Sequence, residues 1–159
     1  MPSQQGFGTD LSASDTIIPI IDLTEAAEGS DVPQILQTAL AFGSQTFFSI
    51  SNSTNTLINT TGFYRVVGVT TIESTSSALN IDLRMNDGAT EKTVWQHLVP
   101  ASGSADSFMS IQFDLVFFLP AGMSLIGTSN NTSAVCAGST RQIADINGTL
   151  VQPVGFTPS

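Results

Sequence analysis

The segment from Phe108 to Leu119 constrains the fold more than any other part of the chain. Apolar and polar side chains alternate along it, which is the pattern of a β-strand with one buried face. The apolar positions are Met109, Ile111, Phe113, Leu115, Phe117 and Leu119, and the polar positions are Ser110, Gln112 and Asp114. At roughly 40 Å if straight, this predicted core strand must span a whole sheet, bend, or extend beyond the body of the protein.

The alternation ends near the carboxyl end of this strand, where Val116 and Phe118 occupy positions on the polar side. Both faces of the strand are therefore apolar there, and something has to cover them. The cover comes either from the chain's own amino-terminal segment or from another subunit. Val116 and Phe118 are accordingly our candidates for a subunit interface.

The composition favours strands over helices. Charged residues make up 11% of the chain, against about 25% in ordinary soluble domains, and Ser, Thr and Asn replace them. Thr is β-branched, and Ser and Asn compete with the helix backbone for its hydrogen bonds. Counting an apolar segment at residues 16–23, the pattern predicts about eight β segments without βαβ alternation, which is typical of an antiparallel β-sandwich, jelly-roll-like.

A chain of 159 residues is long enough for one domain with a sizeable core. One short helix is predicted before the sandwich, because Asp31 can cap it, Pro33 suits its first turn and Gly43 ends it. The predicted parts are an extended amino-terminal arm at residues 1–30, the helix at 31–43, the β-sandwich at 44–147 and an extended tail at 148–159.

The predicted arm contains an apolar stretch around Pro19. Proline has no backbone N–H, so this stretch cannot occupy the centre of a sheet. We expect an edge strand or an extended segment on an apolar surface, either of the sandwich itself or of a neighbouring subunit. Four isoleucines are suited to exchange onto a neighbour, namely Ile17, Ile18, Ile20 and Ile21.

The charge of the chain argues against nucleic acid and membrane partners. The net charge is −9, and the four basic residues are scattered rather than clustered. Nucleic acids and anionic lipids both attract basic surfaces. The sequence has no apolar run of the length, about 18 residues, that a membrane span needs, and it has no secretory signal pattern. We therefore expect synthesis in a cytoplasm and no membrane contact.

No group of residues has the pattern of a catalytic or metal site. His97 is the sole histidine, Cys136 is the sole cysteine, and no Gly-x-Ser-x-Gly segment occurs. Cys136 lies between apolar neighbours, which predicts an inert buried thiol. Glu73, Asp82 and Asp114 could supply a catalytic carboxylate pair of the glycosidase kind, but three solvated carboxylates on the polar faces of strands are the favoured interpretation. We expect no enzyme activity, no cofactor and no metal.

A second function class rests on aromatic residues. Tyr64, Trp95 and His97 are candidates for the lining of a sugar-binding groove. The alternative function is therefore a receptor- or glycan-binding β-sandwich domain of a tail fibre or a lectin. Packing in the core or between subunits accounts for the same residues at least as well.

The core strand is followed by the sequence Leu-Pro-Ala-Gly-Met-Ser-Leu at residues 119–125 and by a closing strand rich in Ser, Thr and Asn. This arrangement resembles the small jelly-roll proteins that decorate or cement the heads of tailed bacteriophages, and the tumour-necrosis-factor-like trimers look similar too. The resemblance covers residues 45–146.

The resemblance implies a non-enzymatic virion structural protein on the surface of the phage head. It implies a homotrimer with symmetric contacts, and the major capsid protein or another virion protein as partner. It also implies that the arm contacts the shell or a neighbouring subunit, for which Ile17, Ile18, Ile20 and Ile21 are the candidate residues.

Overall fold

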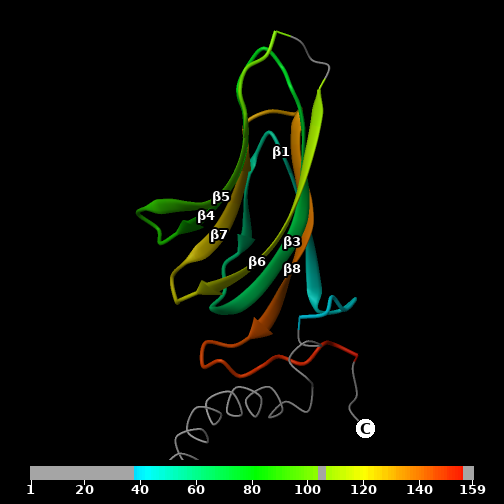
Figure 1. Cartoon of the computed structure of the whole chain (residues 1–159). Coiled ribbons are helices and arrows are strands. Elements are labelled where there is room, and N and C mark those ends of the chain that lie inside the picture. Colours follow the sequence, from blue (N-terminus) through cyan, green and yellow to red (C-terminus); the bar gives the residue numbers. More distant parts are fainter. Residues whose placement is uncertain (1–37, 104–106, 156–159) are drawn as a thin grey trace, which may run out of the picture.

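The computed structural model describes residues 38–103 and 107–155, which form two antiparallel sheets packed face to face (Figure 1). This confirms the predicted antiparallel β-sandwich. The strands are β1 (Gln45–Ser51), β2 (Thr54–Ile58), β3 (Gly62–Glu73), β4 (Leu79–Asn86), β5 (Glu91–Val99), β6 (Phe108–Leu119), β7 (Ser124–Ser129) and β8 (Ala134–Ala144).

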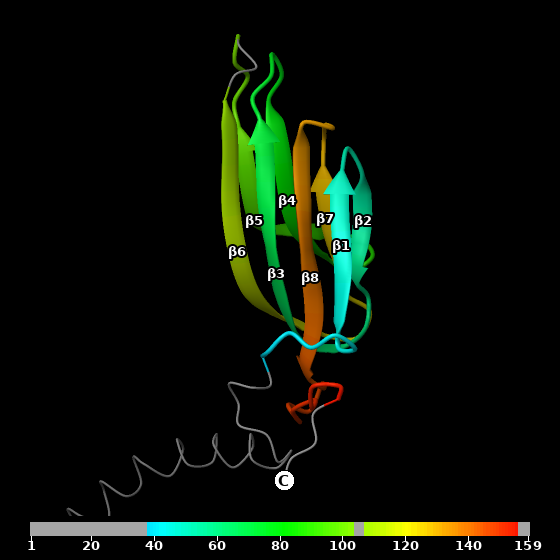
Figure 2. The ribbon, with the colours of Figure 1, turned by 90° about the vertical axis from the view of Figure 1, so that its right-hand side faces the viewer.

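The strand order is that of a jelly roll. Sheet I has the order β1-β8-β3-β6, and sheet II has the order β2-β7-β4-β5. Only β4 and β5 are consecutive strands paired within one sheet, and every other connection between these strands crosses from one sheet to the other. Figure 2 shows β5 and β6 along one side of the sandwich and β1 and β2 along the other.

Strand β6 has the predicted bounds and pairs with β3 along its whole length, from Leu119 opposite Gly62 to Phe108 opposite Glu73. The strand therefore spans the sheet. It is an edge strand of sheet I. Its inward side chains Phe113, Phe117 and Leu119 are buried and Leu115 is partly buried, so the predicted core strand is confirmed for that half. Toward the other end, inward-facing Met109 and Ile111 stay exposed.

Two glycines meet across β3 and β8 where the core packs closely. Gly68 of β3 lies opposite Gly138 of β8, and the register runs through both without a bulge. A Cβ on Gly68 would lie 2.7 Å from Cζ of Phe113, and one on Gly138 would lie 3.0 Å from Cζ of Phe48. The missing side chains thus let two aromatic rings rest on the backbone. A glycine inside a strand indicates either a bulge or a close approach of another group, and at Gly68 the structure has the close approach.

In the sequence, Asn86-Asp87-Gly88 predicts a hairpin turn, because Asn, Asp and Gly tolerate positive φ. The structure confirms it, since this segment connects β4 and β5. Oδ1 of Asp87 accepts hydrogen bonds from the backbone N–H of Ala89 at 2.9 Å and of Thr90 at 2.7 Å. Gly88 has a φ of 96°, which glycine adopts without strain. Figure 1 shows this hairpin projecting from the body of the sandwich.

The helix predicted at 31–43 is absent from its described part, residues 38–43, which forms turns and bends. Contacts with other parts of the chain replace a helical ladder there. The carbonyl of Thr38 accepts a hydrogen bond from Arg65, and the backbone N–H of Val154 donates to Oγ of Ser44 at 2.6 Å. Residues 31–37 and the predicted arm, with its four isoleucines, lie outside the described residues.

Among the residues described, no helix is long and apolar enough to cross a membrane.

The predicted tail at 148–159 is described as far as residue 155. It turns back along the end of β8, where Leu150 forms a bridge with Ala144 and the N–H of Val151 donates to the carbonyl of Ile143 at 2.9 Å.

We expect Gly138→Ala to lower the free energy of unfolding by about 3 kcal/mol, because overpacking of a dense core is costly. The new Cβ would lie 2.1 Å from the carbonyl oxygen of Val67, which is fixed in the sheet. Denaturant unfolding followed by tryptophan fluorescence measures the change. The control is Gly103→Ala, where a Cβ has no neighbour within 4 Å and the change should stay within about 0.5 kcal/mol. Equal effects of both substitutions would contradict the close-approach account.

Candidate subunit interface

The two outer faces of the sandwich differ in charge. On sheet II the outward residues of β4 include Asp82 and Arg84. The Arg84 guanidinium lies 2.8 Å from Asp82 and 2.9 Å from Glu91 of β5. These two hydrogen-bonded carboxylates raise the pKa of Arg84. Such a charged, internally paired face is well suited to remain in water.

The outer face of sheet I is largely neutral and apolar at its centre. Alternation along the strands places Val67, Val69, Val135 and Ala137 there, all only partly buried. The cross-strand register puts Ala137 directly beside Val69, and Val135 directly beside Thr71. An apolar sheet face of small side chains is a surface onto which another protein element can pack closely.

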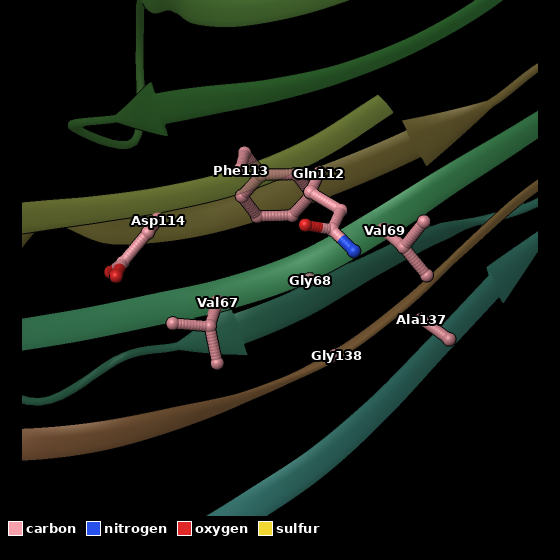
Figure 3. A pocket seen from close by; sticks show the side chains of 8 residues that line it. All are labelled: Val67, Gly68, Val69, Gln112, Phe113, Asp114, Ala137 and Gly138. Carbon is pink, nitrogen blue, oxygen red and sulfur yellow. The ribbon is translucent and has the colours of Figure 1, made fainter. Parts of the chain in front are cut away.

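A shallow, open hollow of about 470 Å³ lies at the centre of this face (Figure 3). Its lining comprises Val67, Gly68, Val69, Gln112, Phe113, Asp114, Ala137 and Gly138. Alternation along β6 places the side chains of Gln112 and Asp114 on the side opposite the buried Phe113 ring. Small-molecule sites are concave and bury most of their ligand. The hollow is too open for that and better fits a complementary protein surface.

One ion pair crosses the rim of the hollow. Nε of Arg65 donates to Oδ1 of Asp114 at 3.0 Å, and Nη2 donates to Oδ2 at 2.7 Å. This two-pronged contact lowers the pKa of Asp114 and raises that of Arg65. The Asp114 carboxylate is therefore held in place by Arg65 and is not poised to act on a ligand.

Exposed apolar side chains flank the hollow. Val116 is 60% exposed, Phe118 is 40% exposed, and Phe47 of β1 is 73% exposed. The ring of Phe118 lies against that of Phe63, with centroids 4.7 Å apart. Val116 and Phe118 thus lack full cover in the described chain. The sequence pointed to these two residues but missed Phe47. The pair Phe47-Phe48 was a usable signal, because adjacent strand residues face opposite sides.

A second exposed apolar patch lies elsewhere on the molecule. Strands β5 and β6 are edge strands of different sheets and lie along the same side of the sandwich (Figure 2). We call the exposed apolar residues there the β5–β6 edge, comprising Val94, Leu98, Phe108, Met109 and Ile111. The molecule therefore offers two different apolar patches, which is what a head-to-tail contact between identical subunits requires.

The residues proposed for a sugar-binding groove lie inside the sandwich instead. Tyr64 is buried and forms a hydrogen bond with the hydroxyl of Thr60. His97 is buried too, with Nδ1 at 2.7 Å from Oγ1 of Thr70. Trp95 is partly buried, and its ring lies 4.8 Å from that of Phe113. These three residues pack in the core and form no surface groove.

The structure also separates the candidates for chemistry. Asp82 and Asp114 lie on the outer faces of opposite sheets, and Glu73 lies at the far end of β3. Cys136 is fully buried, and burial raises the pKa of its thiol to about 12, so the thiolate needed for reaction does not form near neutral pH. In residues 38–103 and 107–155, no three His, Cys, Asp or Glu residues gather as a metal site would require.

Two crystal structures of pentameric capsid proteins isolated from metagenomic phage sequences are similar to this chain. The first is 35% identical with a TM-score of 0.68, covering 82% of this chain and 81% of that chain. The second is 32% identical with a TM-score of 0.68, covering 80% and 87%. The structure of Eiger TNF from S. frugiperda, at 12% identity and a TM-score of 0.41, is too distant to bear on function. No family model and no curated protein matches the chain.

Burial lowers the pKa of His97 below its ordinary value of 6.5, and this predicts a loss of stability in mild acid. Between the lowered pKa and 6.5 the unfolded chain binds a proton that the folded protein excludes. The free energy of unfolding should therefore be flat above about pH 6.5 and fall below it. Thermal unfolding between about pH 8 and pH 5 measures this.

The control is His97→Gln, whose amide can still bond to the Thr70 hydroxyl. Its melting temperature should be flat over the same range. The contribution of Asp114 is lost only in stronger acid, below its ordinary value of 3.8. An equal decline of both proteins near pH 6 would contradict the assignment to His97.

Proposed function

The chain belongs to the family of phage capsid proteins that those two crystal structures represent, and we propose that it is a non-enzymatic structural protein that forms a ring of five subunits. The observation that carries the proposal is the 35% identity to a pentameric capsid protein over 82% of the chain. The resemblance found in the sequence implied three subunits instead. We favour five because both similar capsid proteins are pentameric.

The surface of the sandwich suits such a ring. A ring closes through head-to-tail contacts, in which one patch of each subunit meets a different patch of the next. The outer face of sheet I, with Val116 and Phe118 at its rim, is one such patch, and the β5–β6 edge is the other. We propose that these two patches meet, while the charged outer face of sheet II remains in water.

A ring of five matches the fivefold positions of an icosahedral shell. We propose that the ring sits at such a position on the head surface and contacts the major capsid protein or another virion protein there. Decoration or cementing of the head then follows from many weak contacts repeated by symmetry, because simultaneous contacts raise the overall affinity.

The amino-terminal arm provides a further contact in this proposal. Ile17, Ile18, Ile20 and Ile21 form an apolar stretch, and Pro19 among them prevents a central strand. We propose that this stretch packs on the neighbouring subunit of the ring.

Val69→Glu should dissociate the ring. Its side chain projects from the centre of the outer face of sheet I, where an unpaired buried charge costs about 3 kcal/mol or more per contact. Light scattering coupled to size exclusion should give five subunits for the natural chain and one for this variant. The matched control is Thr56→Glu, which adds the same charge at an exposed β-branched position on sheet II and should leave five subunits.

A natural chain of three subunits or one would overturn the pentamer. A Val69→Glu variant that remains pentameric would instead overturn the assignment of this face.

Replacement of the four arm isoleucines by serine should weaken the ring without unfolding the sandwich. We expect dissociation at a protein concentration at least about tenfold higher, equivalent to 1.4 kcal/mol, with an unchanged melting temperature of the dissociated subunit. Light scattering over a dilution series measures the first quantity, and calorimetry measures the second. The control replaces Ser3, Gln4, Gln5 and Thr9 by alanine, which changes the arm but keeps its isoleucines. Equal dissociation of both variants would refute a specific role for the isoleucines.

A further inference from the structure

Arg141 of β8 has an unusual environment. The residue is only 1% exposed, and none of its three guanidinium nitrogens donates a hydrogen bond to any described residue. A guanidinium carries five N–H donors and keeps its charge in proteins. A buried cation without an acceptor is strongly unfavourable, so this site calls for an anionic partner.

The described neighbours of Arg141 cannot supply that partner. The register places it between Arg65 of β3 and Gln45 of β1. Asp114 is already held by two hydrogen bonds from Arg65. Asp145, just beyond the end of β8, already accepts hydrogen bonds from the backbone N–H groups of Asn147 and Thr149. Glu73 lies eight residues further along β3, roughly 26 Å away. Burial and the nearby Arg65 lower the pKa of Arg141, which agrees with an unsatisfied demand for negative charge.

The segment before Thr38, residues 1–37, carries the negative charge that Arg141 lacks, and from here on the whole segment is called the arm. Residues 1–37 contain no Lys, Arg or His, and they contain six acidic residues, namely Asp10, Asp15, Asp22, Glu25, Glu28 and Asp31. The described chain begins at Thr38, whose carbonyl accepts a hydrogen bond from Nη1 of Arg65. The arm therefore joins the sandwich beside the residue that neighbours Arg141 in the sheet.

Chain length also permits the contact. Asp31 precedes Thr38 by seven residues, which span up to roughly 24 Å when extended, and neighbouring residues across adjacent strands lie only about 5 Å apart. A carboxylate tethered so closely has a high effective concentration at Arg141. Free anions and other subunits lack this advantage.

We propose that the acidic part of the arm, residues 22–31, docks at the Gln45–Arg65 end of the outer face of sheet I of its own chain, outside the central part around Val69 that we assign to the neighbouring subunit. There it places a carboxylate against the guanidinium of Arg141. This docking does not depend on the number of subunits. It also fixes the point from which the preceding isoleucines extend toward a neighbour.

A double-mutant cycle tests the contact. The neutralised arm carries Asp22→Asn, Glu25→Gln, Glu28→Gln and Asp31→Asn, and the second change is Arg141→Met. We expect the neutralised arm to lower the melting temperature of the natural chain by about 5 °C and to change that of the Arg141→Met chain by much less. The matched control is Arg84→Met, because Arg84 is already paired with Asp82 and Glu91. In the Arg84→Met chain the neutralised arm should lower the melting temperature as much as it does in the natural chain.

An equal effect of the neutralised arm in all three backgrounds would overturn the proposal. A second measurement covers the case in which Arg141→Met fails to fold. The Nε–H of Arg141 should give a slowly exchanging nitrogen-15 NMR signal in the natural chain, and that signal should be lost when the arm is neutralised. A signal that persists, or one that appears only on addition of inorganic phosphate, would assign the site to another anion and refute docking of the arm.

The same signal in the Val69→Glu variant distinguishes this inference from the proposed ring. If that variant is a monomer and keeps the signal, the carboxylate comes from the same chain, as proposed. Loss of the signal on dissociation would show that the arm of a second copy supplies it, and would overturn docking within one chain. If the natural chain proves to form no ring at all, the cycle still tests the contact.

Discussion

The register of β3 between β6 and β8 is the constraint on which the rest of the molecule depends. It sets Gly68 opposite Gly138, which lets the rings of Phe48 and Phe113 approach the backbone from inside. On the other side of the same strands it aligns Val67 and Val69 with small side chains of β8. A slip of one residue would exchange the two sides. The core and the candidate interface are therefore two results of one pairing.

The difference between the two outer faces follows from the same alternation. Sheet II uses its outward positions for an ion-paired network around Arg84, whereas the centre of sheet I uses them for small apolar residues. A charged face loses its hydration when it is buried, and an apolar face gains from burial. The sandwich therefore has one face suited to water and one suited to protein, so it can be oriented within a shell.

The sequence predicted what depends on local pattern. Strand β6, the hairpin at Asp87 and the buried thiol of Cys136 were all found, and the resemblance to phage head proteins is confirmed as far as a structural capsid role. The resemblance also implied a trimer, which is not confirmed.

The prediction of a helix fails for residues 38–43, where long-range contacts override local propensity. The predicted sugar-binding groove is wrong because its residues pack inside the sandwich. Alternation shows which side of a strand a residue takes, but it does not show which side is buried when both faces are apolar, as in β3. The isolation of Arg141 depends on cross-strand register, which no single segment encodes.

The proposed contact with Arg141 gives a physical reason for the order of segments in the arm, in which the isoleucines come before the acidic residues 22–31. In the proposed ring, five arms with six acidic residues each would repel one another wherever they come close. Docking residues 22–31 of each arm on its own sandwich, as proposed, would hold four of these six charges apart and pair one of them with Arg141. The isoleucines precede the acidic stretch in the sequence, so in the proposed arrangement a longer tether joins them to the sandwich than joins the docked charges. An apolar segment at that distance can reach a neighbour, whereas the acidic segment stays where its counter-charge is. The buried arginine then acts as the fixed point between the fold of one subunit and its contacts with the next.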